Sequence, residues 1–230
     1  MGVVINFEGG DGSGKGTQSR MAFEEISKWG IEVKLDGFPR YHTPTGKKVA
    51  AYLNGEMGLD VDARTAGKLY TDDRLAFKPE MTEWLSQGGS WVLDRYCDSN
   101  MHQAGKIPTR EGRIEYIQHN TQVEYVENGM PVPDLTILLT LPPELAQTYV
   151  DQKAARSYTA LKRDIHEADP NHLKNANEAF LLFAELNPKR VVVINNLEPN
   201  GDRRSPEAIH QDVMRVIRPL LEARSLVRAA

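Results

Sequence analysis

The stretch from Val3 to Gln18, VVINFEGGDGSGKGTQ, joins an apolar run to a glycine-rich turn. Gly9, Gly14 and Lys15 stand at the spacing G-x-x-x-x-G-K, directly after the strand-like run Val3–Phe7. In such a loop consecutive backbone N–H groups point into one concavity, the following helix adds positive potential, and the lysine ammonium reaches the outer phosphates. The pattern predicts a phosphate-binding loop between a strand and a helix; a flexible glycine turn is the plainer alternative.

Composition limits the other classes of function. With 230 residues and a net charge of −4, we expect one soluble domain, residues 1–230, that does not bind nucleic acid nonspecifically. No apolar run approaches about 18 residues, so we expect no membrane contact. The single cysteine, Cys97, cannot form an intrachain disulfide, which favours a cytoplasmic location. The six histidines show no metal-ligand spacing.

Apolar strand-like runs alternate with segments of helical periodicity. The inner runs are continuously apolar, as in strands covered on both faces, so we predict an α/β fold with a five-stranded parallel sheet and helices on both faces. The predicted strands are Val3–Phe7, Ile31–Leu35, Ser90–Leu93, Leu135–Leu141 and Val191–Asn195. The predicted helices cover about 16–29, 43–56, 61–87, 108–128, 144–153 and 170–186, and a last one starts at Ser205.

A second polar group follows the predicted strand Ser90–Leu93. Asp94 can order Mg²⁺ through its water shell, and Arg95 can donate two hydrogen bonds to one phosphate. Both would lie beside the glycine-rich loop, because ligands of open α/β sheets bind at the carboxyl ends of the strands. Asp94 as a helix N-cap with Arg95 on the surface is the alternative. A GTPase would carry Asn-Lys-x-Asp after a late strand, and none follows Val191–Asn195.

Four segments in register resemble the thymidylate kinases, a family of nucleoside monophosphate kinases with a P-loop. They are Phe7–Gln18, Phe38-Pro39-Arg40, Asp94-Arg95-Tyr96 with Ser99-Asn100, and Pro133–Ile137. The resemblance implies transfer of the ATP γ-phosphoryl to thymidine monophosphate (dTMP), a Mg²⁺ requirement and a homodimer. The rival functions are a kinase for another (deoxy)nucleoside monophosphate and a regulatory nucleotide-binding protein without phosphotransfer.

The resemblance also implies roles for individual residues. Arg40 and Arg95 look like clamps on the acceptor phosphate, Phe38 and Tyr70 like walls of the thymine pocket, and Arg74 like the donor to thymine O4. The expected acceptor contacts are Phe38, Arg40, Tyr41, Tyr70, Arg74, Arg95, Ser99, Asn100 and Gln103. The expected ATP contacts are Gly9, Gly10, Asp11, Gly12, Ser13, Gly14, Lys15, Gly16 and Thr17. Phe38, Tyr70 and Arg74 could instead be ordinary packed residues, and Asn100 a helix cap.

The expected metal residues are Asp11 and Asp94, and the expected catalytic residues are Lys15, Arg95, Asp11, Arg156 and Arg163. Arg156 and Arg163 lie in a charge-rich segment, 154–169, that we predict to be a lid over the phosphates. A lid arginine is expected to supply positive charge to the transferred phosphoryl group, because Ser13 replaces a basic loop residue that some relatives carry. A solvated surface segment is the alternative.

Overall fold

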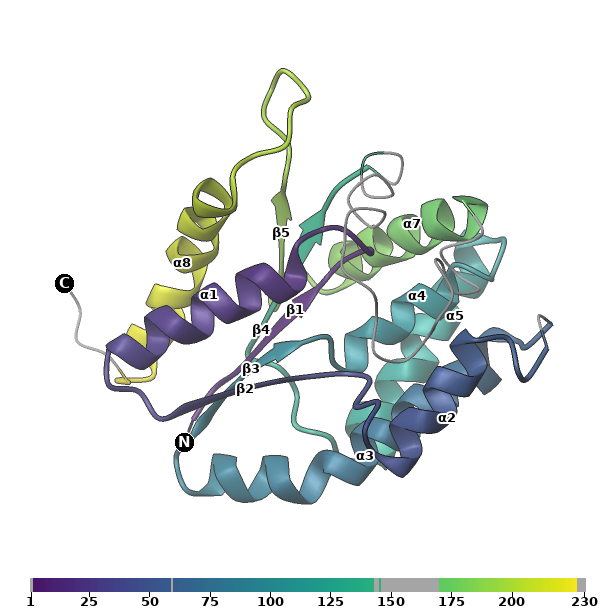
Figure 1. Cartoon of the computed structure of the whole chain (residues 1–230), viewed down its shortest axis with the longest axis horizontal. Coiled ribbons are helices and arrows are strands. Elements are labelled where there is room, and N and C mark those ends of the chain that lie inside the picture. The colour runs from purple at the N-terminus through teal and green to yellow at the C-terminus, as the bar shows by residue number, and fades with distance from the viewer. Residues whose placement is uncertain (1, 59, 143–144, 146–169, 227–230) are drawn as a thin grey trace.

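The computed structural model describes residues 2–58, 60–142, 145 and 170–226, and its centre is a five-stranded parallel sheet (Figure 1). The strands are β1 (Val4–Glu8), β2 (Val33–Gly37), β3 (Ser90–Asp94), β4 (Leu135–Thr140) and β5 (Val191–Asn195). Their order is β2-β3-β1-β4-β5. The predicted α/β architecture is confirmed, and β1 places the glycine-rich loop at the centre of the carboxyl edge.

The helices begin at capping residues that the sequence supplies. Thr43, Thr109 and Ser205 each accept a hydrogen bond from a backbone N–H of the first helical turn, and Asp62 accepts two. The α-helices are α1 (Lys15–Lys28), α2 (Pro44–Leu53), α3 (Ala63–Ser86), α4 (Met101–Ala104), α5 (Arg110–Thr121), α7 (Pro170–Leu186) and α8 (Pro206–Ala223). Two further elements are the 3₁₀-helix η1 (Cys97–Asn100) and the π-helix η2 (Gln122–Glu127).

Helices α1 and α8 cover one face of the sheet (Figure 1). Ile26 of α1 and Val213 and Ile217 of α8 pack against Ile5 and Ile137 of the central strands, and all five are almost completely buried. The burial of such side chains contributes about 1.5–3 kcal/mol each. This layer holds α1, and therefore the start of the phosphate loop helix, firmly on the sheet.

Helices α3, α4, α5 and α7 lie on the opposite face (Figure 1). Phe77 and Met81 of α3 pack against Trp91 and Leu93 of β3. A second cluster joins α4, α5 and α7 to β4. In the part of the chain that the structure describes, no helix combines the length and the apolar character that a membrane span requires.

Three details differ from the predictions. Strand β2 begins at Val33 rather than Ile31, because Val33 pairs with Ser90, the first residue of β3. The helix predicted through about Asn128 is regular only to Thr121 and continues as the π-helix η2. Elements η1 and α4 were not predicted. The predicted helix 144–153 lies, apart from residue 145, outside the described residues.

Candidate active site

The loop after β1 has the conformation of a phosphate cradle. Gly14 is the N-cap of α1 with a φ of 90°, and no side chain in the described part of the chain caps that helix end. The amides at the start of α1 therefore point into the loop, where they can bind an anion. The Lys15 Nζ donates to the Gly10 carbonyl over 2.8 Å, so its ammonium lies across the concavity. This confirms the predicted strand–turn–helix context.

One glycine of this loop is required by a close approach of the backbone. Gly9 has a φ of 138°, and a Cβ placed on it would lie 2.2 Å from the Leu139 carbonyl oxygen of β4. Any side chain there would separate the loop from β4.

A cavity of about 580 Å³ opens beside the loop. Asp11, Lys15 and Thr17 line it from the loop and α1, while Asp94 and Arg95 line it from the end of β3. The structure therefore brings predicted ATP-phosphate residues and Arg95, one of the two predicted acceptor-phosphate residues, to one cavity, while Arg40 does not line it. The cavity is large enough for the phosphates of a nucleotide.

The Asp94 carboxylate suits a hydrated Mg²⁺. Its Oδ1 is buried and has no hydrogen-bond partner among the described residues. The other oxygen, Oδ2, would lie 2.9 Å from a Cβ on Gly16, so Asp94 is in contact with the first turn of α1. An unpaired carboxylate oxygen next to a phosphate cradle is the ligand type that Mg²⁺ prefers. No three His, Cys, Asp or Glu side chains converge on a common point within the described ranges.

Arg95 is held in an unusual conformation and in a strongly acidic environment. Its φ of 72° is in the left-handed region. Its guanidinium forms an ion pair with Asp11 of the loop. Burial works against its charge, but the carboxylates of Asp11, Asp94 and Glu8 raise its pKa above the ordinary arginine value. Arg95 stays cationic at the cavity, as a phosphate ligand must.

Glu8, which the sequence reasoning did not select, anchors the turn that carries Arg95. This completely buried carboxylate accepts hydrogen bonds from the Tyr96 N–H over 2.9 Å and from the Ser99 hydroxyl over 2.8 Å. Burial and the nearby Asp98 raise the pKa of Glu8 to about 7, although Arg95 and the two hydrogen bonds lower it. Ser99, a predicted substrate contact, therefore has a partner within the protein.

The segment with Arg40 follows β2, the strand that pairs with β3. The Phe38–Pro39 peptide bond is cis, and the Phe38 N–H donates to the Asp94 carbonyl over 3.1 Å, so this segment and Arg95 lie at the same sheet edge. The Arg40 guanidinium lies 4.4 Å from the centre of the Phe77 ring. Asp73 of α3 accepts a hydrogen bond from the Arg40 N–H over 2.7 Å and fixes the turn.

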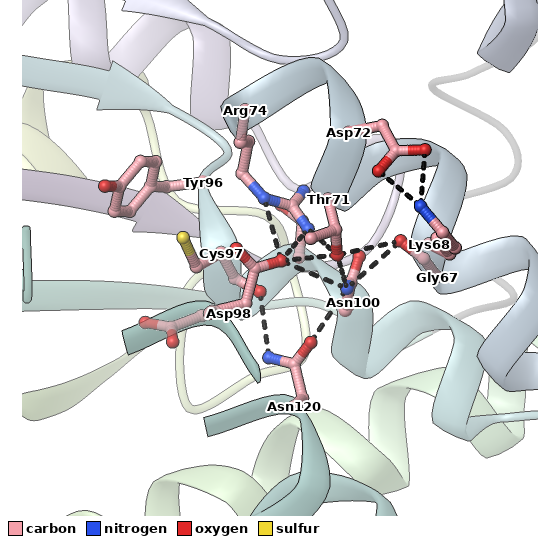
Figure 2. Close-up of polar contacts among 12 residues, drawn as sticks. Gly67, Lys68, Thr71, Asp72, Arg74, Tyr96, Cys97, Asp98, Asn100 and Asn120 are labelled. Carbon is pink, nitrogen blue, oxygen red and sulfur yellow. Dashed lines mark hydrogen bonds and ion pairs between the residues drawn. The ribbon is translucent and has the colours of Figure 1, made fainter. Parts of the chain in front are cut away.

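The predicted base-pocket residues Phe38, Arg74 and Asn100 gather at α3, because Arg74 belongs to this helix and the other two contact it. Phe38 packs edge-on against Phe77 at 5.5 Å between ring centres. Arg74, Thr71 and Asn100 point toward one another (Figure 2). The Arg74 guanidinium is completely buried in an ion pair with Glu124.

Tyr70 and Gln103 are connected through α2. Tyr70 packs edge-on against Tyr52 at 6.3 Å between ring centres. The Tyr52 hydroxyl donates to the Gln103 side-chain carbonyl over 3.2 Å and accepts from the Lys106 ammonium over 2.8 Å. Tyr41 packs against the same group of residues around Tyr52. Helix α2 therefore contacts two of the predicted acceptor residues, Tyr70 and Gln103, through Tyr52.

Comparison with known proteins decides the family. A family model described as thymidylate kinase matches residues 7–204. This chain belongs to the thymidylate kinase family.

Thymidylate kinase relatives cover nearly the whole chain. The thymidylate kinase of Symbiobacterium thermophilum is 26% identical over 228 residues, which span 97% of this chain and 96% of the relative. That of Lactobacillus helveticus is 30% identical over 210 residues, 87% of this chain and 91% of the relative. The solved thymidylate kinase from Candida albicans superposes with a TM-score of 0.70 at 22% identity, covering 95% and 92% of the two chains. This last likeness concerns the fold.

The thymidylate kinase site also contains two residues that the sequence reasoning missed. The Asn196 amide donates to the Ser13 carbonyl over 2.6 Å, and the Arg203 guanidinium donates to the Gly12 carbonyl over 3.2 Å. Both side chains come from the segment after β5 and donate to backbone carbonyls of the phosphate loop. The position of Asn196 at the end of a parallel strand was the available signal. Arg156, Arg163 and the predicted lid 154–169 lie outside the described residues.

Proposed function

We propose that this thymidylate kinase family member transfers the γ-phosphoryl group of ATP to dTMP and forms dTDP. Two buried polar atoms carry the proposal: the Arg74 Nη1 and the Asn100 Oδ1 have no hydrogen-bond partner among the described residues. Leaving a buried donor or acceptor unpaired costs about 1–3 kcal/mol, so such atoms in a pocket indicate a ligand that completes them.

The donor side uses the phosphate loop. We assign the ATP phosphates to the loop amides from Gly9 to Thr17, with the Lys15 ammonium leaving the Gly10 carbonyl to bind the outer phosphates. Asp94, with its unpaired oxygen, would hold Mg²⁺ through water, and Asp11 would lie close to it. When bound, Mg²⁺ neutralises charge on the phosphate oxygens.

The acceptor side uses the arginines at the same edge. Arg95 and Arg40 would bind the phosphate of dTMP, and Arg95 would exchange its contact with Asp11 for that phosphate. The acceptor phosphate oxygen is already ionised near neutral pH, so it attacks the γ-phosphorus without a general base. The new O–P bond forms as the bond to the bridging oxygen of ADP breaks. Alignment and charge neutralisation by protein groups supply the catalysis.

The contacts to the base determine which nucleotide serves as the acceptor. Arg74 Nη1 is a donor for the O4 of thymine, and Asn100 Oδ1 is an acceptor for its N3–H. Phe38 and Tyr70 provide the aromatic walls, with Tyr41, Ser99 and Gln103 around the sugar and phosphate. Arg156 and Arg163, in the predicted lid, are proposed to bring positive charge to the transferred group.

The oligomeric state and the compartment are proposed on narrower grounds. A homodimer is proposed from the family resemblance. A cytoplasmic location is proposed from the single cysteine, Cys97, which is completely buried.

A panel of acceptors tests the activity. ATP is supplied with dTMP, dUMP, dGMP or CMP, and ADP formation is followed. Strong preference for dTMP supports the proposal. Preference for another monophosphate would indicate a kinase of different specificity. ATP binding without ADP formation from any acceptor would indicate a regulatory nucleotide-binding protein.

A further inference from the structure

Glu124 accepts hydrogen bonds from two of the three nitrogens of the Arg74 guanidinium. Its Oε1 accepts from Arg74 Nε over 3.2 Å, from Arg74 Nη2 over 2.5 Å and from the Thr71 hydroxyl over 2.7 Å. Both charged side chains are completely buried. Burial works against the charge of Arg74, but the Glu124 carboxylate raises its pKa, so Arg74 remains a cation. The guanidinium is planar, so fixing Nε and Nη2 also fixes the direction of Nη1.

The π-helix η2 positions Glu124. The Asn128 N–H donates to the Val123 carbonyl over 2.9 Å, which is the i→i+5 bond of a π-turn. Within this turn Glu124 is buried, whereas Glu127 is exposed. The departure from a regular helix therefore coincides with the residue that orients Arg74, as π-turns often do at functional sites.

Asn120 fixes the orientation of the Asn100 amide. The Asn120 Nδ2 donates to the Cys97 backbone carbonyl over 3.2 Å, and a carbonyl can only accept. The opposite end of the Asn120 amide, Oδ1, must therefore face Asn100, and it accepts from Asn100 Nδ2 over 2.8 Å. This chain of contacts leaves Asn100 Oδ1 as the atom without a partner among the residues that the structure describes (Figure 2).

The side chains that carry the donor and the acceptor meet at Thr71. Arg74 Nη2 and Asn100 Nδ2 approach the same Thr71 hydroxyl, at 3.4 Å and 3.3 Å. A base with a 4-oxo group presents an acceptor at O4 and a donor at N3, which match this pair. A 4-amino base presents a donor at the 4-position and an acceptor at N3, which oppose both atoms. A site built from buried polar groups rejects the mismatched analogue strongly.

We propose that Glu124 and Asn120 are positioning residues that set this pattern, so that the pocket selects 4-oxo over 4-amino pyrimidine nucleotides. The inference rests on the proposed function, because it concerns the same acceptor pocket. Arg74 and Asn100 touch the base, and Glu124 and Asn120 act through them.

The test compares two variants with matched controls. Glu124→Gln removes the carboxylate charge, and Glu127→Gln makes the same change at the exposed residue of the same π-turn. Asn120→Leu removes the amide that contacts Asn100 and the Cys97 carbonyl. Gln118→Leu makes an apolar change at an exposed position of α5. For each protein, kcat/KM is measured with dTMP and with dCMP, together with KM for ATP and the melting temperature.

We expect the ratio of kcat/KM for dTMP to that for dCMP to fall by about 10- to 100-fold in Glu124→Gln and Asn120→Leu, and to stay unchanged in both controls. KM for ATP should not change. If either variant does not fold, the other provides the measurement, and Thr71→Val, which removes the shared hydroxyl, replaces the missing one.

Two results would overturn the inference. A lower melting temperature with an unchanged dTMP-to-dCMP ratio would mean that Glu124 and Asn120 only stabilise the fold. A wild-type protein that does not prefer dTMP to dCMP would overturn the proposed function as well, and this outcome is visible before any variant is made.

Discussion

Asp11 of the phosphate loop forms an ion pair with Arg95, which follows β3. This contact joins the loop expected to bind ATP to the arginine expected to bind the acceptor phosphate. A phosphate entering the cavity would compete with the Asp11 carboxylate for the same guanidinium. The two binding events are therefore expected to be coupled through this pair.

Removal of the Arg95 guanidinium should affect the acceptor specifically. We expect Arg95→Ala to lower kcat/KM for dTMP by about 100-fold or more, because charge-assisted hydrogen bonds to phosphate are stronger than hydrogen bonds between neutral groups. KM for ATP should change far less. Steady-state kinetics with each substrate varied separately measure both values, and Arg215→Ala, at an exposed arginine of α8, is the control. Equal losses for both substrates would contradict the assignment of Arg95 to the acceptor.

Removal of the Lys15 ammonium should abolish turnover and leave the fold intact. Lys15 crosses the concavity of the loop and contributes little to the apolar core. We expect Lys15→Ala to lower kcat by about 10³-fold or more, since the ammonium neutralises charge on the transferred group. ADP formation and the melting temperature are measured beside Lys28→Ala, at the opposite end of α1. A near-normal kcat in Lys15→Ala would refute the phosphate-loop assignment.

The buried Glu8 should make stability depend on pH. Its pKa is raised from 4.5 to about 7, so between these values the folded state binds more protons than the unfolded state. The free energy of unfolding then falls as pH rises through this window, by up to about 3 kcal/mol.

We expect Glu8→Gln to abolish this dependence, because an amide does not titrate. Urea unfolding of both proteins at pH 5 and pH 8 measures it. Groups that do not interact with Glu8 contribute equally to both proteins, so the difference between them reports Glu8 and its interactions with Asp98 and Arg95. Parallel pH profiles for the two proteins would contradict the raised pKa of Glu8.

Asp73 should contribute more to stability and to dTMP binding than its neighbour Asp72. The buried Asp73 carboxylate accepts hydrogen bonds from the Arg40 N–H and from the Thr43 and Thr45 hydroxyls. Asp73→Ala removes the acceptor of the Arg40 N–H and of the two hydroxyls, so we expect a loss of about 1–3 kcal/mol in the free energy of unfolding and a higher KM for dTMP.

Asp72→Ala is the matched control for Asp73→Ala. Asp72 is 39% exposed, and the ion pair that it forms within the described residues is an i,i+4 pair with Lys68, which contributes about 0.5 kcal/mol or less. Urea unfolding and dTMP kinetics of the two variants give the comparison. Similar effects of the two substitutions would show that Asp73 does not hold the Arg40 segment.

The sequence predicted the features that depend on local pattern. The five strands, the loop with Gly14 and Lys15, and the approximate starts of α2, α3, α5 and α8 each follow from residues within a few positions of one another. The end of β3 could be placed beside the loop because parallel strands end at one edge.

The residues that could not be predicted act through contacts across the fold. Glu8 reaches Ser99, and Glu124 reaches Arg74, over separations of 91 and 50 residues. The hydrophobic periodicity of a sequence does not reveal such contacts between distant residues. The π-turn at Gln122–Glu127 was equally hidden, because its apolar spacing continues that of α5. Arg74 was selected by resemblance, but its burial against Glu124 required the structure.

A crystal structure with dTMP and a non-hydrolysable ATP analogue tests the central claim most directly. We predict the triphosphate in the loop around Lys15, the dTMP phosphate on Arg95, and thymine O4 and N3 within hydrogen-bond distance of Arg74 Nη1 and Asn100 Oδ1. An empty cavity at the carboxyl edge of the sheet, or a base bound away from Arg74 and Asn100, would contradict it.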